Sequence, residues 1–330
     1  MRHDHRPFLL PSPLLLGGTL GLVSPAGVAP AGQIDRAATI LAERGYRVVV
    51  GEHAGDDGTG NGYSYLAGTD DDRAADLNGF LADPAVDLVL CTRGGYGCAR
   101  LLHLLDFDAL RRDPKPIVGY SDFTALSLAV AARAGVASFS GIMATAGDGF
   151  SESTLDPFSE ASFWQAVSAG GFDTTYAAPV DAASWTVHRA PSLGDTVTGA
   201  LYPVCLSLLV SLVGTPYLPD LTNAILLIED VHEELYAVDR MLTQLRHAGL
   251  LANVTAVLIG SFNGTTPDKD AELIAGVPRL VLENTPLSVA VVSGVAYGHI
   301  ARRLTVPVGV VGTAHLSQSA FVFDTGRKAG

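Results

Sequence analysis

The sequence predicts an α/β fold whose N-terminal half is built on an open parallel sheet. Short apolar runs alternate with helical patterns over the first 140 residues, as expected for parallel strands joined by crossover helices. The runs are continuous rather than alternating, so helices should cover both faces of the sheet. The predicted strands of this half are 20–24, 47–50, 87–91, 117–120 and 136–139.

Helices are expected between these strands. Apolar residues recur at helical spacing over 34–42, and Gly45 follows as a stop signal. The acids from Asp70 to Asp72 begin a second helix, where carboxylates complement the helix dipole and the free N–H groups.

The length and a change in composition divide the chain. A single core rarely serves more than about 250–300 residues, so 330 residues favour two domains. The stretch 144–198 is rich in Ser, Thr, Gly, Asp and Ala and shows no strong strand. The predicted parts are a flexible tail (1–15), an N-terminal domain (16–150), a connector (151–197) and a C-terminal domain (198–330).

The C-terminal half also mixes helices and strands. Residues 201–212 are predicted as an apolar helix that ends at Gly214, and the apolar spacing over 235–245 predicts an amphipathic helix that ends at Gly249. Further strands are expected at 224–228, 254–259, 288–292 and 321–323.

The charge and the cysteine content narrow the class of function. With 21 basic and 34 acidic residues the net charge is −13, which disfavours a nucleic-acid partner. The number of cysteines is odd, and no pair has the spacing of a metal site; the three are Cys91, Cys98 and Cys205. A disulfide framework is therefore not expected, which favours a reducing compartment.

The N-terminus resembles a secretory signal, because a basic start precedes the apolar residues 9–22. Prolines and glycines interrupt that run, so we expect a tail followed by a buried strand. The sequence contains no uninterrupted run of 18 apolar residues, so no membrane-spanning helix is predicted.

Ser121 is the first candidate for chemistry. It follows the apolar strand at 117–120 and precedes a helix, so its hydroxyl should lie at the carboxyl edge of the sheet beside free helix N–H groups. Phe123 stands where a G-x-S-x-G elbow has its second glycine. The alternative is that Ser121 or Asp122 merely caps the helix.

A glycine-rich turn, 93–97, follows the preceding strand at the same sheet edge. It could supply a second oxyanion donor or cradle a ligand, or it could be a simple turn. It lacks the Lys-Ser/Thr pair of a phosphate-binding P-loop.

Glu229 and His299 are the remaining candidates. Glu229 ends an apolar strand, where a carboxylate is costly unless something pairs with it. His299 follows Tyr297-Gly298, although a lone histidine is more often structural. A serine, an imidazole and a carboxylate are the parts of a catalytic triad. His232 beside Glu233 has no second histidine one turn away, so no metal is expected.

Taken in order, these segments resemble the LD-carboxypeptidase family of serine peptidases, which includes muramoyl-tetrapeptide carboxypeptidases and microcin C immunity peptidases. The similarity extends from Gly18 to Phe323. The stretches that carry it are 23–27, 68–70, 73–78, 93–97, 119–126, 229–230 with Tyr236, 239–242 and 297–299.

The resemblance implies a flavodoxin-like N-terminal domain, a smaller C-terminal α/β domain with a mixed sheet, and a site in the cleft. It implies Ser121 as nucleophile with Glu229 and His299 as partners. It places the oxyanion hole at the backbone N–H groups of Gly95 and Asp122. The residues expected to bind substrate are Gly94, Tyr96 and Met143.

It further implies no metal or cofactor, a cytoplasmic setting and a homodimer. The expected reaction is release of the terminal D-alanine from a murein tetrapeptide by cleavage of an L,D bond. One alternative is an amidase acting on peptidyl- or aminoacyl-nucleotides. Another is a two-domain ligand-binding protein without catalysis. A dinucleotide enzyme is disfavoured, because no G-x-G-x-x-G follows the first strand.

Overall fold

In the structure, a computed structural model, the chain forms two compact units. The first unit contains residues 1–155 and 167–169, and the second contains 156–166 and 170–330. The described residues are 8–58, 62–145, 149–152, 155–168, 174–179, 183–191 and 194–323.

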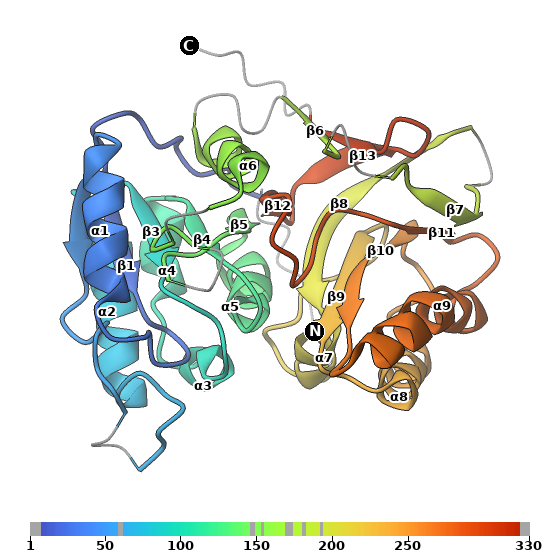
Figure 1. The fold of residues 1–330 in the computed structure, drawn as a ribbon, viewed down its shortest axis with the longest axis horizontal. Coiled ribbons are helices and arrows are strands. Elements are labelled where there is room, and N and C mark those ends of the chain that lie inside the picture. The colour runs from blue at the N-terminus through green and yellow to red at the C-terminus, as the bar shows by residue number, and fades with distance from the viewer. Residues whose placement is uncertain are drawn as a thin grey trace. The chain divides into compact units, whose positions relative to one another are not determined.

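A parallel sheet forms the centre of the first unit (Figure 1). Its strands pair in the order β2-β1-β3-β4-β5, which is the flavodoxin-like order predicted by the family resemblance. Buried aliphatic residues form the three central strands, as the continuous apolar runs predict. The strands are β1 (Thr19–Val23), β2 (Arg47–Val50), β3 (Leu88–Cys91), β4 (Ile117–Gly119) and β5 (Ser138–Ser140).

Helices connect these strands, and those predicted over 34–42, from Asp70 and after Ser121 are all present. Ile34, Ala37 and Leu41 form the buried face of α1. The side chain of Thr69 caps the N-terminus of α2 by accepting the Asp72 N–H. The helices are α1 (Gln33–Glu43), α2 (Asp70–Ala82), α3 (Cys98–Leu101), α4 (Phe107–Arg112) and α5 (Phe123–Ala129), which continues as the π-helical turn η1 (Val130–Ala134).

The second unit holds an eight-stranded mixed sheet, in the order β6-β14-β13-β8-β9-β10-β11-β7. The strands β8 to β11 are parallel, and the outer pairings are antiparallel. The strands are β6 (Thr174–Ala177), β7 (Thr186–Arg189), β8 (Thr196–Cys205), β9 (Ile225–Val231), β10 (Ala256–Asn263), β11 (Ala290–Ser293), β13 (Val311–His315) and β14 (Ala320–Phe323). A further short strand of this unit is β12 (Val306–Val308).

Helices complete the second unit. The amphipathic helix α8 buries Val238, Leu242 and Leu245, as predicted from their spacing. Thr266 caps the long helix α9, and Pro267 lies at its first position, where its missing N–H costs nothing. The helices are α6 (Pro157–Val167), α7 (Leu206–Ser211), α8 (Leu235–His247) and α9 (Pro267–Asn284).

The predicted helix over 201–212 is wrong in its first part. Strand β8 continues to Cys205 and only then gives way to α7. Residues 201–205 pair with residues 225–229 of β9 and are buried. A strand buried on both faces has a continuous apolar sequence, which periodicity alone does not distinguish from a buried helix.

The connector and the tail also differ from expectation. The stretch 151–197 contains α6, β6 and β7, which belong largely to the second unit, so that unit is not the smaller one. Of the predicted flexible tail, some residues between 8 and 15 are held against the first unit. Leu9 pairs with Val136 as an isolated β-bridge, and Leu14 is buried.

Over the residues that the structure describes, no helix combines the length and the apolar character needed to cross a membrane.

Candidate active site

Ser121 occupies a strained turn between β4 and α5. Its φ is 63°, a left-handed conformation that is unusual for a residue with a side chain. The Ser121 carbonyl accepts the Thr124 N–H at 2.9 Å, so the helix begins directly after the turn. Backbone strain of this kind is a feature of functional turns, and a strand-to-helix elbow presents its serine hydroxyl at the sheet edge.

The glycine-rich loop after β3 lies directly against Ser121. A Cβ atom at Gly94 would lie 2.8 Å from the Cβ of Ser121 and 3.2 Å from its Oγ, so only glycine fits there. The Gly94 carbonyl accepts the Gly27 N–H at 3.2 Å, which ties this loop to the one after β1. Gly95 follows with φ 115°. The carboxyl ends of three neighbouring strands thus meet at Ser121.

The side chain of Asp122 does not cap its own helix. Its carboxylate is 1% exposed, and Oδ2 accepts the N–H of Cys98 at 2.7 Å. Burial raises the pKa of this carboxyl, and the Cys98 N–H opposes that effect. The capping alternative is therefore wrong for Asp122, because its side chain reaches the start of α3 instead.

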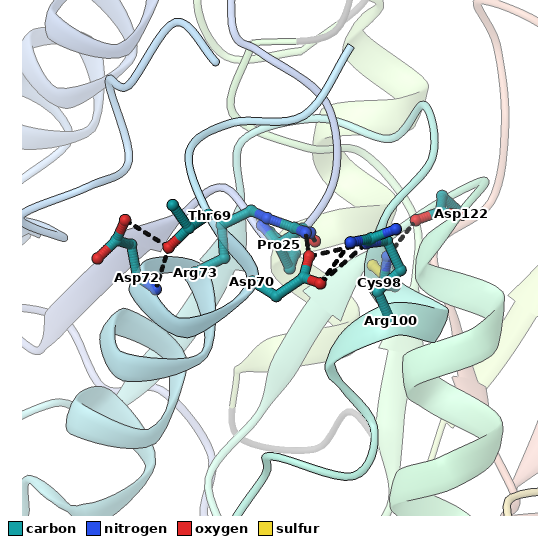
Figure 2. Close-up of polar contacts among 8 residues, drawn as sticks. All are labelled: Pro25, Thr69, Asp70, Asp72, Arg73, Cys98, Arg100 and Asp122. Carbon is teal, nitrogen blue, oxygen red and sulfur yellow. Dashed lines mark hydrogen bonds and ion pairs between the residues drawn. The ribbon is translucent and has the colours of Figure 1, made fainter. Parts of the chain in front are cut away.

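A buried arginine joins the neighbouring loops (Figure 2). Arg73 donates to the carbonyl of Pro25 and pairs with Asp70. Asp70 also holds Arg100, with Oδ2 2.6 Å from Nη2. The Arg100 hydrogen bond is the main cause of the lowered pKa of the Asp70 carboxyl. Sequence reasoning assigned Asp70 to the helix N-terminus and missed this network. Its one sequence signal is the i, i+3 spacing of Asp70 and Arg73.

Glu229 and His299 form a hydrogen-bonded pair within the second unit. Glu229 lies near the end of β9 and is fully buried, and its Oε2 is 2.7 Å from Nδ1 of His299. The His299 side chain keeps 25% of its surface exposed. A buried carboxylate on Nδ1 fixes the ring so that Nε2 is available as a base. The other oxygen, Oε1, has no hydrogen-bond partner among the described residues.

The loop that carries His299 is fixed on the neighbouring strand β10. The N–H of Ser261 donates to the carbonyl of Tyr297 at 2.8 Å. Gly298 has φ 129°, and a Cβ there would lie 1.9 Å from Oγ of Ser261. Ser261 is therefore a support of this loop that the sequence did not reveal, because it belongs to a distant strand.

Asp230, next to Glu229, is a second buried carboxylate. Its Oδ2 accepts the N–H of Ser207 at 2.7 Å, at the start of α7, and its Oδ1 lies 3.3 Å from Sγ of Cys205. Burial raises the pKa of the Asp230 carboxyl. The residue was not predicted as functional. It fixes the turn after β8 against the end of β9.

The residues expected to bind substrate have different environments. Tyr96 is 47% exposed and contacts the ring of Tyr65, with centroids 6.0 Å apart. Met143 is buried and accepts the Phe150 N–H at its carbonyl. Tyr96 is thus accessible to a ligand in this structure, whereas the Met143 side chain is not.

One group of side chains in the described chain has the spacing of metal ligands. It consists of His53, Asp56 and Asp72, whose candidate ligand atoms lie within 4.8 Å of one another. His53 is 3.2 Å from Asp56 and 3.7 Å from Asp72, so these groups already form ion pairs when the histidine is charged.

The chain is similar to known proteins along almost its whole length. Residues 20–141 match the LD-carboxypeptidase N-terminal domain, and residues 198–313 match the LD-carboxypeptidase C-terminal domain. The chain is 32% identical over 322 residues to a Bacillus subtilis protein named "Probable murein peptide carboxypeptidase", with 97% of this chain and 96% of that one covered.

Two solved structures have the same fold. Muramoyltetrapeptide carboxypeptidase from Oxalobacter formigenes matches with a TM-score of 0.75 and 30% identity, covering 92% of this chain and 97% of that one. MccF in complex with glutamyl sulfamoyl guanosine matches with a TM-score of 0.82 and 23% identity, covering 97% and 99%. Both domain models match in order, and a relative is more than 30% identical along almost the whole chain. This protein therefore belongs to the LD-carboxypeptidase family of serine peptidases.

Proposed function

We propose that the protein is a serine carboxypeptidase that hydrolyses an L,D-peptide bond in murein-type peptides and releases the terminal D-alanine. The observation that carries the proposal is the hydrogen bond between Glu229 and His299, which prepares an imidazole base. The strained turn at Ser121 and the names of the murein peptidase relatives support it.

In the proposed mechanism Ser121 Oγ attacks the scissile carbonyl while Nε2 of His299 takes its proton. Glu229 stabilises the imidazolium that forms. The N–H groups of Gly95 and Asp122 bind the oxyanion; losing one such donor typically costs about 10²–10³ in rate. His299 then protonates the leaving D-alanine amine. Water, activated by the same imidazole, hydrolyses the acyl-enzyme and regenerates the serine.

Two measurements test the proposal together. Purified protein is incubated with a murein tetrapeptide, and released D-alanine is quantified by mass spectrometry. A fluorophosphonate probe is used in parallel, and the labelled residue is located by peptide mapping. We expect release of D-alanine and a label on Ser121. Ser121→Ala should lose both, whereas Ser211→Ala, at an exposed serine of α7, should keep both.

The results distinguish the alternatives. MccF, with the same fold, binds glutamyl sulfamoyl guanosine, which makes an aminoacyl-nucleotide the second candidate substrate class. Cleavage of an aminoacyl-adenylate analogue in place of the tetrapeptide, with Ser121 labelled, would favour that amidase. A protein that binds peptides but leaves the probe unreacted would be the non-catalytic ligand-binding protein, and the triad proposal would be wrong.

The homodimer and the cytoplasmic setting stay predictions from the family resemblance. Sedimentation equilibrium measures the first, and fractionation of cells that express the protein measures the second. A monomer at micromolar concentration would contradict the dimer.

A further inference from the structure

The carboxylate of Asp122 is buried beside the proposed nucleophile without serving its own helix. It lies one residue after Ser121, is 1% exposed, and has no hydrogen bond to the N–H groups of α5. Its second oxygen, Oδ1, is buried and has no hydrogen-bond partner among the described residues. Burying a carboxylate is unfavourable, so the contact that it does make calls for an explanation.

That contact connects two separate turns of the first unit. Oδ2 of Asp122 accepts the N–H of Cys98 at 2.7 Å, and the backbone N–H of Gly97 also lies against the carboxylate. Cys98 is the first residue of α3 and directly follows the glycine-rich loop 93–97. The side chain that follows the nucleophile therefore binds the end of the loop proposed to supply an oxyanion donor.

The same loop is also held by other contacts. Gly94 lies against Ser121, and its carbonyl accepts the Gly27 N–H. Arg73, next to Gly97, donates to Pro25 in the loop after β1 (Figure 2). These contacts hold the loop at both ends, and the bond from Asp122 to Cys98 adds one from the residue that follows the nucleophile.

We propose that Asp122 is a positioning residue, whose carboxylate holds the end of the 93–97 loop so that the Gly95 N–H stays in place beside Ser121. The inference rests on the proposed serine peptidase function. It separates two roles of one residue: the backbone N–H of Asp122 contacts the oxyanion, whereas its side chain fixes the position of the other donor. A donor displaced by about 1 Å loses much of its effect in the transition state.

The test uses the second-order rate constant for fluorophosphonate labelling of Ser121, with kcat and KM on the murein tetrapeptide where it is cleaved. Asp122→Ala keeps the backbone N–H and removes the carboxylate. We expect its labelling rate and kcat to fall about 10²-fold, the typical loss of one oxyanion donor, with KM within about threefold. Asp122→Asn keeps an acceptor oxygen for Cys98 and should stay within about tenfold of the unmodified protein.

A matched control removes a different capping carboxylate of the same unit. Asp106 caps α4 by accepting the Ala109 N–H at 2.9 Å. Asp106→Ala should lower the melting temperature but leave the labelling rate of the folded protein unchanged. A purely structural role of Asp122 predicts the same behaviour for Asp122→Ala, so an unchanged rate in that variant would overturn the inference while leaving the proposed function intact.

Two further outcomes also test the role of Asp122. If Asp122→Ala does not fold, Asp122→Asn carries the test: a rate within about tenfold supports the acceptor role, and a loss beyond about 10²-fold in a folded protein overturns it. Absence of any label on the unmodified protein would overturn the proposed function and this inference with it.

Discussion

Nδ1 of His299 lies 2.7 Å from Oε2 of Glu229, a carboxylate with no exposed surface. The pair joins the end of β9 to the loop after β11, two segments 70 residues apart in the chain. A buried carboxylate beside an imidazole favours the tautomer that leaves Nε2 unprotonated and stabilises the charged ring during proton transfer.

Glu229→Gln should therefore lower kcat strongly and leave KM nearly unchanged. A neutral amide fits the same space but favours the wrong tautomer, an effect of about 10⁴-fold in serine triads. The measurement is D-alanine release at saturating tetrapeptide. Glu233→Gln, a half-buried acid of the following loop, is the control and should keep its rate. A Glu229→Gln rate within about tenfold of the unmodified protein would exclude the orienting role.

Gly298→Ala should lower kcat by more than its loss of folding stability explains. The new Cβ would lie 1.9 Å from Oγ and 2.9 Å from Cβ of Ser261, so the His299 loop must move. Gly294→Ala is the matched control, because that glycine is also left-handed, with φ 88°, but its nearest contact is at 3.8 Å.

Both variants carry the conformational cost of about 1–2 kcal/mol for a side chain at positive φ. Activity should fall only for Gly298→Ala, and Ser261→Gly in the same chain should recover part of it. Similar kcat values for the two single variants would show that the contact with Ser261 does not position the histidine.

Arg73→Met should destabilise the first unit more than Arg100→Met does, although both arginines bind Asp70. The Arg73 side chain is 1% exposed and that of Arg100 is 33% exposed. Arg73 also donates to the Pro25 carbonyl, which loses that donor in the variant. Breaking a buried pair typically costs about 3–5 kcal/mol, and an exposed pair contributes less than about 1 kcal/mol. Urea unfolding of the two variants measures the difference, and equal losses would contradict this ranking.

The sequence predicted the elements whose signals are local. Strand β2 and the helices α1 and α8 were predicted because strand runs, helical spacing and glycine stops all lie within a few residues. The turn at Ser121 was predicted for the same reason. Residues 201–205 were assigned to a helix, because their pairing with the distant strand β9 is not visible in the local sequence.

The site shows the same limit. Periodicity offered Ser121, Glu229 and His299 as separate candidates, and only the family resemblance paired them. The supports of these residues were missed, since Ser261, Asp230 and Arg73 each act on a segment brought near by the fold. The destination of the Asp122 side chain was also missed, because Ser-Asp before a helix is the usual sequence of a cap.

Asp70 should contribute a pH-dependent part of the stability. Its carboxyl pKa is lowered, first by the hydrogen bond from Arg100 and also by Arg73. A depressed carboxyl pKa stabilises the folded state above the unfolded value of about 3.9, and the contribution is lost as pH falls toward the lower folded pKa. Asp70→Asn should therefore be less stable than the unmodified protein at pH 7, and the difference should shrink below about pH 4.

Urea midpoints at a series of pH values measure this difference. Asp71→Asn is the control, because Asp71 is exposed in the same first turn of α2 and loses the same interaction with the helix dipole. If the urea midpoints of Asp70→Asn and Asp71→Asn changed with pH in parallel, the helix dipole alone would account for the loss of stability. A gap between the curves that closes in acid would instead assign it to the arginines, since only Asp70 lies within hydrogen-bond distance of Arg100 and Arg73.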